Sequence, residues 1–430
     1  MGGFAGTHHD TVLALEQAGE CRLVCTCDPA LEQFTERGQN LRLTERGVRL
    51  FTDYREMLRA CREELDVVTI PTPVPLHAEM HRAVVAHGLA VYLEKPPTLN
   101  AAELAAMLAV EARAVKLTNV GFNYIVDPLR QRMKQRLVAG EFGAVRRVSV
   151  RVMWPRPTSY YQRANWPGRL RLNGQLVLDS CIGNAMAHHV HDGLFWGGAA
   201  RQWQWGDVRE VTAELYRAHA IEGTDTVFLR ATLAAGPVVD VVMSHACAPR
   251  ENHYAEETVE CEQATLAYHA YPPGPALPQC AITWNDGRTE EALPANINYN
   301  HENFRAYFAY LRGETERPIT RLIDSQPFVH LNSLAYLAAG RIVSVPAATI
   351  QRTPTADGQA EYVAIADIDA IAERFALEGI FPSAQGIHWA RPGGTASVTD
   401  LPRLEQVIDG MIVEGVTTPA LAETPHRATR

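Results

Sequence analysis

Alternating strand and helix patterns in the first third of the chain restrict its fold more than any other feature. An apolar segment at residues 66–70 precedes a helix pattern that starts at His77, and a second apolar segment, residues 89–93, precedes a helix pattern at residues 100–114. Each apolar segment is short enough for a strand, and each helix pattern is long enough to cross over between parallel strands. The alternation predicts a doubly wound α/β domain, which we place at residues 1–122.

Polar residues follow two of these strands directly. Thr72 lies in the proline-rich segment of residues 71–77, which cannot be helical over most of its length, and Glu94 and Lys95 follow the second strand. Ligands of an open parallel sheet bind at the carboxyl ends of its strands. We therefore expect Thr72, His77, Glu94 and Lys95 to line a ligand site. For His77, a packing or capping role at the start of its helix is the alternative.

The first residues contain most of a dinucleotide-binding glycine turn. Gly2, Gly3, Phe4 and Ala5 supply its later positions, and a helix pattern begins at Thr7. Such a turn normally follows an apolar strand, and the helix behind it offers its N-terminal amides to a pyrophosphate. Because no such strand precedes Gly2, we expect that the start was assigned too late and that the first strand is missing. A flexible start with a chance glycine pattern is the alternative.

An acidic residue follows the next apolar segment. Asp28 comes directly after residues 21–27, about 20 residues beyond the glycines, where a carboxylate binds the ribose of an adenosine group. Pro29 follows, and no nearby arginine is placed to balance a 2′-phosphate, so the sequence favours NAD over NADP. Asp28 also suits a helix N-cap, and the two roles are compatible.

Strands with short connections dominate from residue 145 onward. The expected strands cover residues 145–154, 210–217, 225–233, 238–244, 254–268 and 280–284. Their connections are too short for crossover helices, so the sheet should be mostly antiparallel. We therefore expect an α+β domain with a large open sheet at residues 123–346. Residues 347–430 form a C-terminal extension to which the sequence assigns no chemistry.

One helix interrupts this second domain, at residues 180–196. Asn184, His188 and His191 fall at positions i, i+4 and i+7, a narrow polar stripe beside an apolar one. Such a stripe can present an amide and an imidazole to a substrate, although a solvated helix face has the same pattern. No complete set of metal ligands accompanies these histidines, so we expect no metal.

Aromatic residues and arginines gather ahead of this helix, in residues 154–171. Tyr161, Arg163 and Trp166 lie in this segment, together with Arg156. Aromatic rings cover the apolar faces of sugars, and an arginine can form paired hydrogen bonds with a carboxylate. The segment suits a sugar, especially one that carries a carboxylate. A subunit interface is the alternative, because the same residue types are enriched there.

The bulk composition excludes several classes of protein. A formal net charge of −9 over 430 residues disfavours a nucleic-acid partner. No apolar segment reaches the roughly 18 residues that span a bilayer, and the N-terminus shows no secretory pattern. Eight scattered cysteines without a CxxC pair favour reduced thiols. We expect a cytoplasmic protein without membrane or nucleic-acid partners.

Several of these features together resemble the Gfo/Idh/MocA family of oxidoreductases. They are the starting glycines, Asp28, the segment of residues 71–77, Glu94-Lys95-Pro96 and the polar helix. The resemblance covers roughly residues 1–345, and Glu94-Lys95-Pro96 after a strand is its most specific part. It implies a Rossmann-type domain, a second domain that often forms oligomer contacts, and NAD(P)-linked oxidation or reduction. We therefore expect a homo-oligomeric, NAD-dependent oxidoreductase acting on a sugar, polyol or sugar acid.

The resemblance also implies roles for individual residues. Lys95 matches the family lysine that binds the reacting hydroxyl, and His188 matches the catalytic histidine. The family has an aspartate four positions before that histidine, where this chain has Asn184. An alternative register puts Asp179 on the aspartate, but then Gly183 replaces the histidine.

Two departures from the family pattern leave alternatives open. Asn184 can orient an imidazole but cannot offset its positive charge. Asn123 is implied near the substrate, but Ile125 stands where the family often has an arginine, so the sugar contacts should differ. The alternatives are an NAD-dependent glycosidase that oxidises its substrate transiently, and a catalytically silent NAD-binding sensor or regulatory protein.

Overall fold

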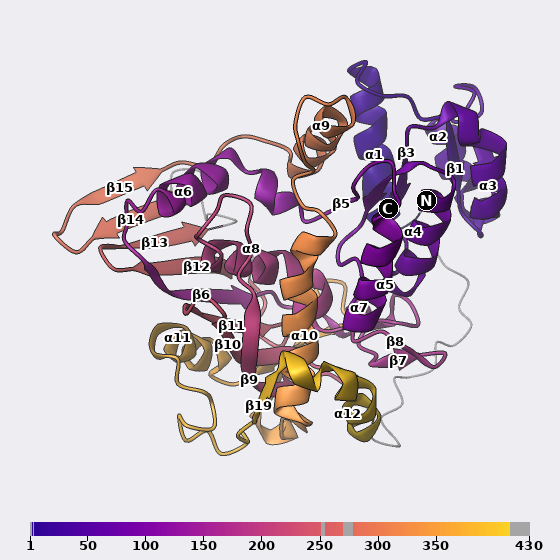
Figure 1. Cartoon of the computed structure of the whole chain (residues 1–430). Coiled ribbons are helices and arrows are strands. Elements are labelled where there is room, and N and C mark those ends of the chain that lie inside the picture. The colour runs from indigo at the N-terminus through magenta and orange to yellow at the C-terminus, as the bar shows by residue number, and fades with distance from the viewer. Residues whose placement is uncertain (1, 3, 251–253, 270–277, 413–430) are drawn as a thin grey trace. The chain divides into compact units, whose positions relative to one another are not determined.

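The computed structural model describes residues 2, 4–250, 254–269 and 278–412. The chain forms two compact units (Figure 1). The first comprises Met1–Thr98, Ala102–Asp127 and Asn296–Gln326, and the second comprises Leu99–Ala101, Pro128–Ala295 and Pro327–Arg430. Among the described residues, no helix combines the length and apolar character needed to cross a membrane.

The first unit is an α/β structure with parallel strands. Its helices and strands, boundary residues aside, are α1 Phe4–Gln17, β1 Cys25–Cys27, α2 Thr35–Asn40, β2 Arg49–Phe51, α3 Tyr54–Cys61, β3 Val67–Ile70, α4 His77–Ala86, β4 Ala90–Leu93, α5 Ala101–Glu111, β5 Asn119–Val120 and α9 Tyr299–Leu311. The strands form two separate parallel sheets, β1-β2 and β3-β4-β5. The predicted alternation of strands and helices is confirmed.

Helix α9 belongs to this first unit, although it comes late in the chain. Its Phe304 stacks on Tyr92 of β4 with ring centroids 4.0 Å apart, and Asn303 donates to the Tyr92 hydroxyl at 2.9 Å. Tyr307 donates to the carbonyl of Leu117. The expected boundary, which placed residues 123–346 in one domain, therefore differs from the structure. Buried aromatic contacts, which no local pattern reveals, decide where α9 packs.

The second unit is organised around a ten-stranded, mostly antiparallel sheet. Its strand order is β15-β14-β13-β12-β6-β11-β10-β9-β16, and β19 pairs with β9. The strands are β6 Val145–Met153, β9 Val208–Arg217, β10 Thr226–Leu233, β11 Val238–Ser244, β12 Tyr254–Cys261, β13 Ala264–His269, β14 Cys280–Trp284, β15 Thr289–Ala292, β16 Ile342–Ser344 and β19 Thr395–Ser397. Among the described strand pairs of this sheet, only β6–β11 and β9–β16 are parallel. The predicted large open sheet is confirmed, but residues 254–268 form two strands and not one.

Helices cover both faces of this sheet at β6. Gly193 of α8 (Ala187–Gly197) lies so close to Val150 that an added Cβ would stand 2.7 Å from it. The Ser149 hydroxyl donates to the carbonyl of Ala376 in α11 (Ile368–Glu378) at 2.9 Å. Neighbouring residues of a strand point to opposite faces, so α8 and α11 lie on opposite sides. Residues 347–412, expected as a separate extension, therefore complete the second unit.

The remaining elements of the second unit are helices and short strands outside the large sheet. They are α6 Pro128–Val138, α7 Thr158–Gln162, β7 Arg171–Leu172, β8 Gln175–Leu176, α10 Gln326–Ala339, β17 Ile350–Pro354, β18 Glu361–Ile365 and α12 Leu404–Met411. Of these, α7 carries part of the aromatic and arginine segment, and α6 supplies the buried cations described below.

Candidate active site

His77 joins the segments that follow β3 and β4. Its side chain is fully buried, with Nε2 2.7 Å from the carbonyl oxygen of Thr72 and Nδ1 3.0 Å from that of Pro96. Burial lowers the pKa of His77, although the two carbonyl contacts oppose this shift. The imidazole therefore ties the residue that follows Lys95 to the segment after β3, and Lys95 itself is half-buried. These contacts fit the packing role that the sequence left open for His77, while its expected contact with a cofactor stays a prediction.

Glu94 connects the end of β4 to helix α1. Its Oε2 lies 3.1 Å from Nε2 of His8, which packs edge-on against the rings of Tyr92 and Phe304. A Cβ on Gly121 would stand 2.9 Å from the same carboxylate oxygen, so only glycine fits there without displacing it. Sequence reasoning missed His8, because it lies 86 residues from its partner.

The first turn of α1 and the end of β1 provide the predicted dinucleotide positions. Phe4 and Ala5 open α1, the side chain of Phe4 is largely exposed, and the first turn contains no acidic residue. A Cβ on Gly2 would stand 2.9 Å from the ring of Phe34, whereas Gly3 lies outside the described residues. His9 of α1 contacts the Thr26 hydroxyl of β1 at 2.8 Å. The start of the helix is thus held against a strand whose end carries Asp28.

Asp28 stabilises the turn that follows β1, and its expected contact with a ribose stays a prediction. Its Oδ1 accepts a hydrogen bond from the Ala30 backbone N–H at 3.0 Å, which turns the chain toward a short helix. The residue follows β1 directly, at the carboxyl end of a parallel strand. The first unit thus offers backbone N–H groups at the start of a helix, a carboxylate at the end of one strand and a lysine after another strand. These groups fit a dinucleotide.

Asn123 lies in the first unit, away from solvent. Its Nδ2 donates to Oδ1 of Asn300 at 2.5 Å, just after the N-cap of α9. A cavity of about 590 Å³ also lies in this unit, but none of the predicted site residues lines it. Its lining comes from α1 and the segment after α2: Asp10, Leu13, Ala14, Gln17, Asn40, Leu41, Arg42, Glu45 and Arg46. This cavity therefore does not coincide with the predicted site residues at the ends of the strands.

In the second unit, the predicted helix at residues 180–196 is divided in two. Residues Cys181–Ala185 form a π-helical turn, Met186 breaks the regular geometry, and α8 then begins at Ala187. Asn184 is therefore not at position i−4 of a continuous α-helix. Its Nδ2 donates to Oδ1 of Asp179 at 2.9 Å. Both residues that competed for the family aspartate position are thus in contact.

The three histidines of α8 lie in different environments. His188 is half-buried, whereas His189 and His191 are buried. Trp205 donates its indole N–H to Nδ1 of His191 at 3.3 Å. The helix turns His191 into the core of the unit, and its expected contact with substrate stays a prediction.

A buried ion-pair network lies on the inner side of α8. Arg130 of α6 pairs with Glu257 at 2.5 Å and with Asp192 at 3.3 Å, and His189 lies 3.4 Å from Glu257. Burial alone would raise the pKa of Glu257, but the charge of Arg130 and the hydrogen bond with His189 lower it to about 2. His189, Asp192 and Glu257 are close enough to bind a metal ion, but the guanidinium already supplies the positive charge there.

Lys134, also on α6, holds the end of α8. Its ammonium donates to the carbonyls of Phe195, Gly198 and Gln204, the last two at 2.9 and 3.1 Å. Burial lowers the pKa of Lys134 to about 7. Together with the Arg130 network, this contact fixes the helix that carries His188.

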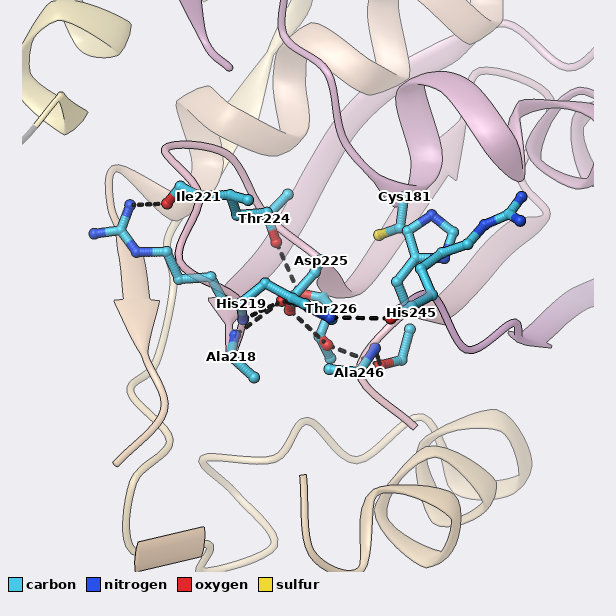
Figure 2. Close-up of polar contacts among 12 residues, drawn as sticks. Cys181, Ala218, His219, Ile221, Thr224, Asp225, Thr226, His245 and Ala246 are labelled. Atoms are coloured by element: carbon cyan, nitrogen blue, oxygen red, sulfur yellow. Dashed lines mark hydrogen bonds and ion pairs between the residues drawn. The ribbon is translucent and has the colours of Figure 1, made fainter. Parts of the chain in front are cut away.

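The aromatic and arginine segment is braced by a buried histidine and aspartate (Figure 2). One oxygen of Asp225 accepts from the backbone N–H groups of Ala218 and His219 and lies 2.7 Å from Nδ1 of His219. Burial alone would raise the pKa of Asp225, but His219 lowers it. The ring of Tyr161, which is buried, packs 4.9 Å from that of His219. Tyr161 is therefore a packing residue here, while Arg163 is exposed and Trp166 is half-buried.

The family assignment follows from comparison with known proteins. Residues 1–122 match the model of the Gfo/Idh/MocA family, described as an oxidoreductase family with an NAD-binding Rossmann fold. Residues 1–122 therefore carry the NAD-binding domain of this oxidoreductase family. This confirms the resemblance drawn from the sequence.

Curated relatives of this chain include carbohydrate dehydrogenases. D-xylose 1-dehydrogenase (NADP(+)) 2 of Haloferax volcanii is 42% identical over 83 residues, 19% of this chain and 25% of the relative. Inositol 2-dehydrogenase of Rhizobium meliloti is 30% identical over 103 residues, 24% and 31% of the two chains. D-apiose dehydrogenase of Paraburkholderia graminis is 26% identical over 265 residues, 61% and 64%. The chain therefore spans from a quarter to under two thirds of these relatives.

Solved structures extend the likeness of fold to most of the chain. Levoglucosan dehydrogenase in complex with NADH has a TM-score of 0.62 at 17% identity, covering 77% of this chain and 93% of that one. The WlbA dehydrogenase from Bordetella pertussis, in complex with NADH and UDP-GlcNAcA, has a TM-score of 0.59 at 21% identity, covering 77% and 91%. These likenesses confirm the two-part fold, a Rossmann-type domain followed by a large, mostly antiparallel sheet. The roles of Lys95, His188 and Asn184 remain predictions.

Proposed function

We propose that this protein is an NAD-dependent dehydrogenase that acts on a CH–OH group of a sugar, polyol or sugar acid. The observation that carries this proposal is the arrangement around Lys95. A lysine follows a strand of an NAD-binding Rossmann fold. The buried His77 holds the carbonyl of Pro96 after this lysine, and the side chain of the buried Glu94 before it contacts His8. Bound NAD supplies the acceptor or donor of the hydride.

The residues of the first unit suit the parts of this cofactor in order. The first turn of α1, which lacks acidic side chains, would hold the pyrophosphate through its backbone N–H groups. Asp28 would accept hydrogen bonds from the adenosine ribose and would repel a 2′-phosphate. Thr72 and Lys95, after β3 and β4, would lie on the nicotinamide side. We therefore propose NAD over NADP, although one relative carries NADP(+) in its name.

Each unit contributes one residue for which we propose a role in the proton chemistry, Lys95 in the first and His188 in the second. The Lys95 ammonium would stabilise the negative charge that develops on the hydroxyl oxygen as its proton leaves. The His188 imidazole would accept that proton in oxidation and return it in reduction. Asn184 would orient this group, and the Asp179 carboxylate at 2.9 Å from Asn184 would supply the negative charge that asparagine lacks.

We also propose a homo-oligomer that works in the cytoplasm. All eight cysteines are free, which suits a reducing compartment. Analytical ultracentrifugation of the purified chain measures the oligomeric state directly.

A panel of sugars, polyols and sugar acids tests the proposed activity, with NADH absorbance as the readout. The chain has only three lysines, at positions 95, 116 and 134, so Lys116→Ala is a matched control for Lys95→Ala in the same unit. We expect Lys95→Ala and His188→Ala to lower kcat/KM by roughly 100-fold or more, and Lys116→Ala to leave it unchanged. Variants that stay within a few fold of wild type would refute these roles. NADH binding without turnover of any substrate would favour the silent sensor.

A further inference from the structure

Two arginines of the second unit lie in an alternating stack with aromatic rings. The Arg156 guanidinium carbon lies 4.2 Å from the ring centroid of Trp154 and 4.5 Å from that of Tyr160. The corresponding carbon of Arg163 lies 3.6 Å from the Tyr160 centroid and 4.9 Å from that of Trp166. We call these five residues the arginine–aromatic ladder. Both guanidinium groups share one ring, so two positive charges are held close together.

The arginines of the ladder differ from other stacked arginines in having no acidic partner. The other arginines that stack on rings in the described part of the chain are all ion-paired: Arg55 with Glu79, Arg130 with Glu257, Arg136 with Glu141, Arg151 with Glu256, and Arg288 with Asp286. Arg156 and Arg163 form no ion pair with any described residue. The Nε of Arg156 is buried without an acceptor there, and Arg163 donates to the Tyr160 carbonyl at 2.6 Å.

The missing negative charge is not supplied by the nearby aspartate. Burial raises the pKa of Tyr160, and the negative charge of Asp179 raises it further. The two oxygens of Asp179 accept from the Gly168 backbone N–H at 2.6 Å and from Asn184 at 2.9 Å. Burial, together with the charge of Arg163, lowers the pKa of Arg156. An anion bound alongside the two guanidinium groups, at the edge of the stack, would relieve this repulsion.

The backbone beneath the ladder is fixed before any ligand binds. Nε2 of His219 lies 3.1 Å from the Arg156 carbonyl oxygen, and the Arg156 backbone N–H donates to the carbonyl of His245 at 3.1 Å. Asp225 holds His219 in turn, as Figure 2 shows. A rigid support of this kind lowers the entropic cost of binding.

We propose that the arginine–aromatic ladder binds the carboxylate of the substrate, so that the substrate is a sugar acid. Arg156 and Arg163 form charge-assisted hydrogen bonds with the carboxylate, and Trp154 and Trp166 cover apolar faces of the sugar. The ladder is linked through Asp179 to Asn184, which precedes the candidate catalytic helix. This inference rests on the proposed dehydrogenase function, whose substrate it specifies.

Calorimetric titration of the full chain without NAD tests the ladder separately from turnover. The probes are D-glucuronate, D-galacturonate and D-gluconate, each beside its neutral counterpart D-glucose, D-galactose or D-glucitol. We expect at least one acid to bind roughly tenfold or more tightly than its neutral counterpart. Added salt should weaken that binding. Equal affinity for the acid and its neutral counterpart in all three pairs would overturn the proposal. If only the proposed dehydrogenase function is wrong, an acid will bind without any reduction of NAD.

Variants assign the binding to the ladder. We expect Arg156→Gln and Arg163→Gln each to weaken acid binding roughly tenfold or more, without changing the affinity for neutral sugars. Arg288→Gln is the matched control, because Arg288 also stacks on a tryptophan but has its own carboxylate partner. Arg163 is exposed, so its variant should fold even if Arg156→Gln does not. Variants that retain acid binding but dissociate oligomers in sedimentation would show that the ladder is a subunit interface, which overturns the proposal.

Discussion

Replacing Arg130 by methionine should destabilise the second unit strongly. The side chains of Arg130, Asp192 and Glu257 are at most 1% exposed, and Arg130 is 2.5 Å from Glu257 and 3.3 Å from Asp192. The substitution removes the cation and leaves two buried carboxylates. Breaking a buried pair in this way costs about 3–5 kcal/mol, and stacking of the guanidinium on Trp196 and Tyr268 is lost as well. We therefore expect a loss of about 4 kcal/mol or more in the free energy of unfolding.

The pH dependence of this loss follows from the pKa of Glu257. In the wild type that pKa is lowered from 4.5 to about 2, so Glu257 contributes stability that is present above pH 4.5 and is lost as the pH falls toward 2. In Arg130→Met the buried carboxyl no longer faces a cation, and its pKa rises above the unfolded value. Stability of the variant then falls as the pH rises. The difference between the two proteins should grow from pH 4 to pH 7.

Urea unfolding followed by tryptophan fluorescence measures this loss in the second unit alone. All seven tryptophans lie in that unit. Arg130→Met/Glu257→Met should recover much of the loss, because it removes a buried charge of each sign. Arg288→Met, at an exposed ion pair, should cost less than about 1 kcal/mol. A loss below about 1 kcal/mol in Arg130→Met, or one that does not vary with pH, would refute the reasoning.

Three further predictions concern other buried polar groups. Lys134→Met removes the donor to three carbonyls at the end of α8. We expect it to lower the free energy of unfolding in urea by about 2 kcal/mol and to lower kcat by displacing His188. An unchanged urea midpoint would contradict this. Burial lowers the pKa of His81 to about 4, so the wild type should lose up to about 3 kcal/mol between pH 6.5 and 4 as the unfolded chain takes up a proton. His81→Gln should flatten that slope in unfolding followed by circular dichroism, and a parallel slope would count against it. Gly121→Ala brings a Cβ within 2.9 Å of the Glu94 carboxylate. We expect this Cβ to break the contact between Glu94 and His8 and to weaken NADH binding about tenfold. An unchanged affinity for NADH would show that this contact does not shape the site.

The parts of the fold that the sequence predicted well depend on local patterns. The apolar segments at residues 66–70 and 89–93 correspond to β3 and β4, because hydrophobic runs bounded by prolines and glycine have few other stable forms. The alternation at residues 145–154 likewise gives β6. In contrast, the turn at residues 262–263, which divides the strand expected at 254–268, has no proline or glycine to mark it.

Long-range contacts and helix irregularities limited the prediction of the site. The contact between Glu94 and His8 spans 86 residues, and no spacing rule connects them. A π-helical turn before α8 shifts the register, so Asn184 meets Asp179 instead of continuing the stripe toward His188 and His191. Residue types therefore identified the polar groups of this region, but only the structure showed which are buried supports.

Titration of the chain with NADH, followed by nicotinamide fluorescence, tests the central claim most directly. The first unit contains no tryptophan, so the nicotinamide signal must be followed itself. We predict saturable binding by the wild type and by Lys116→Ala, together with weaker binding by Asp28→Ala. NADPH should bind more weakly than NADH. A chain that binds neither cofactor would contradict the assignment of the first unit as a working NAD site.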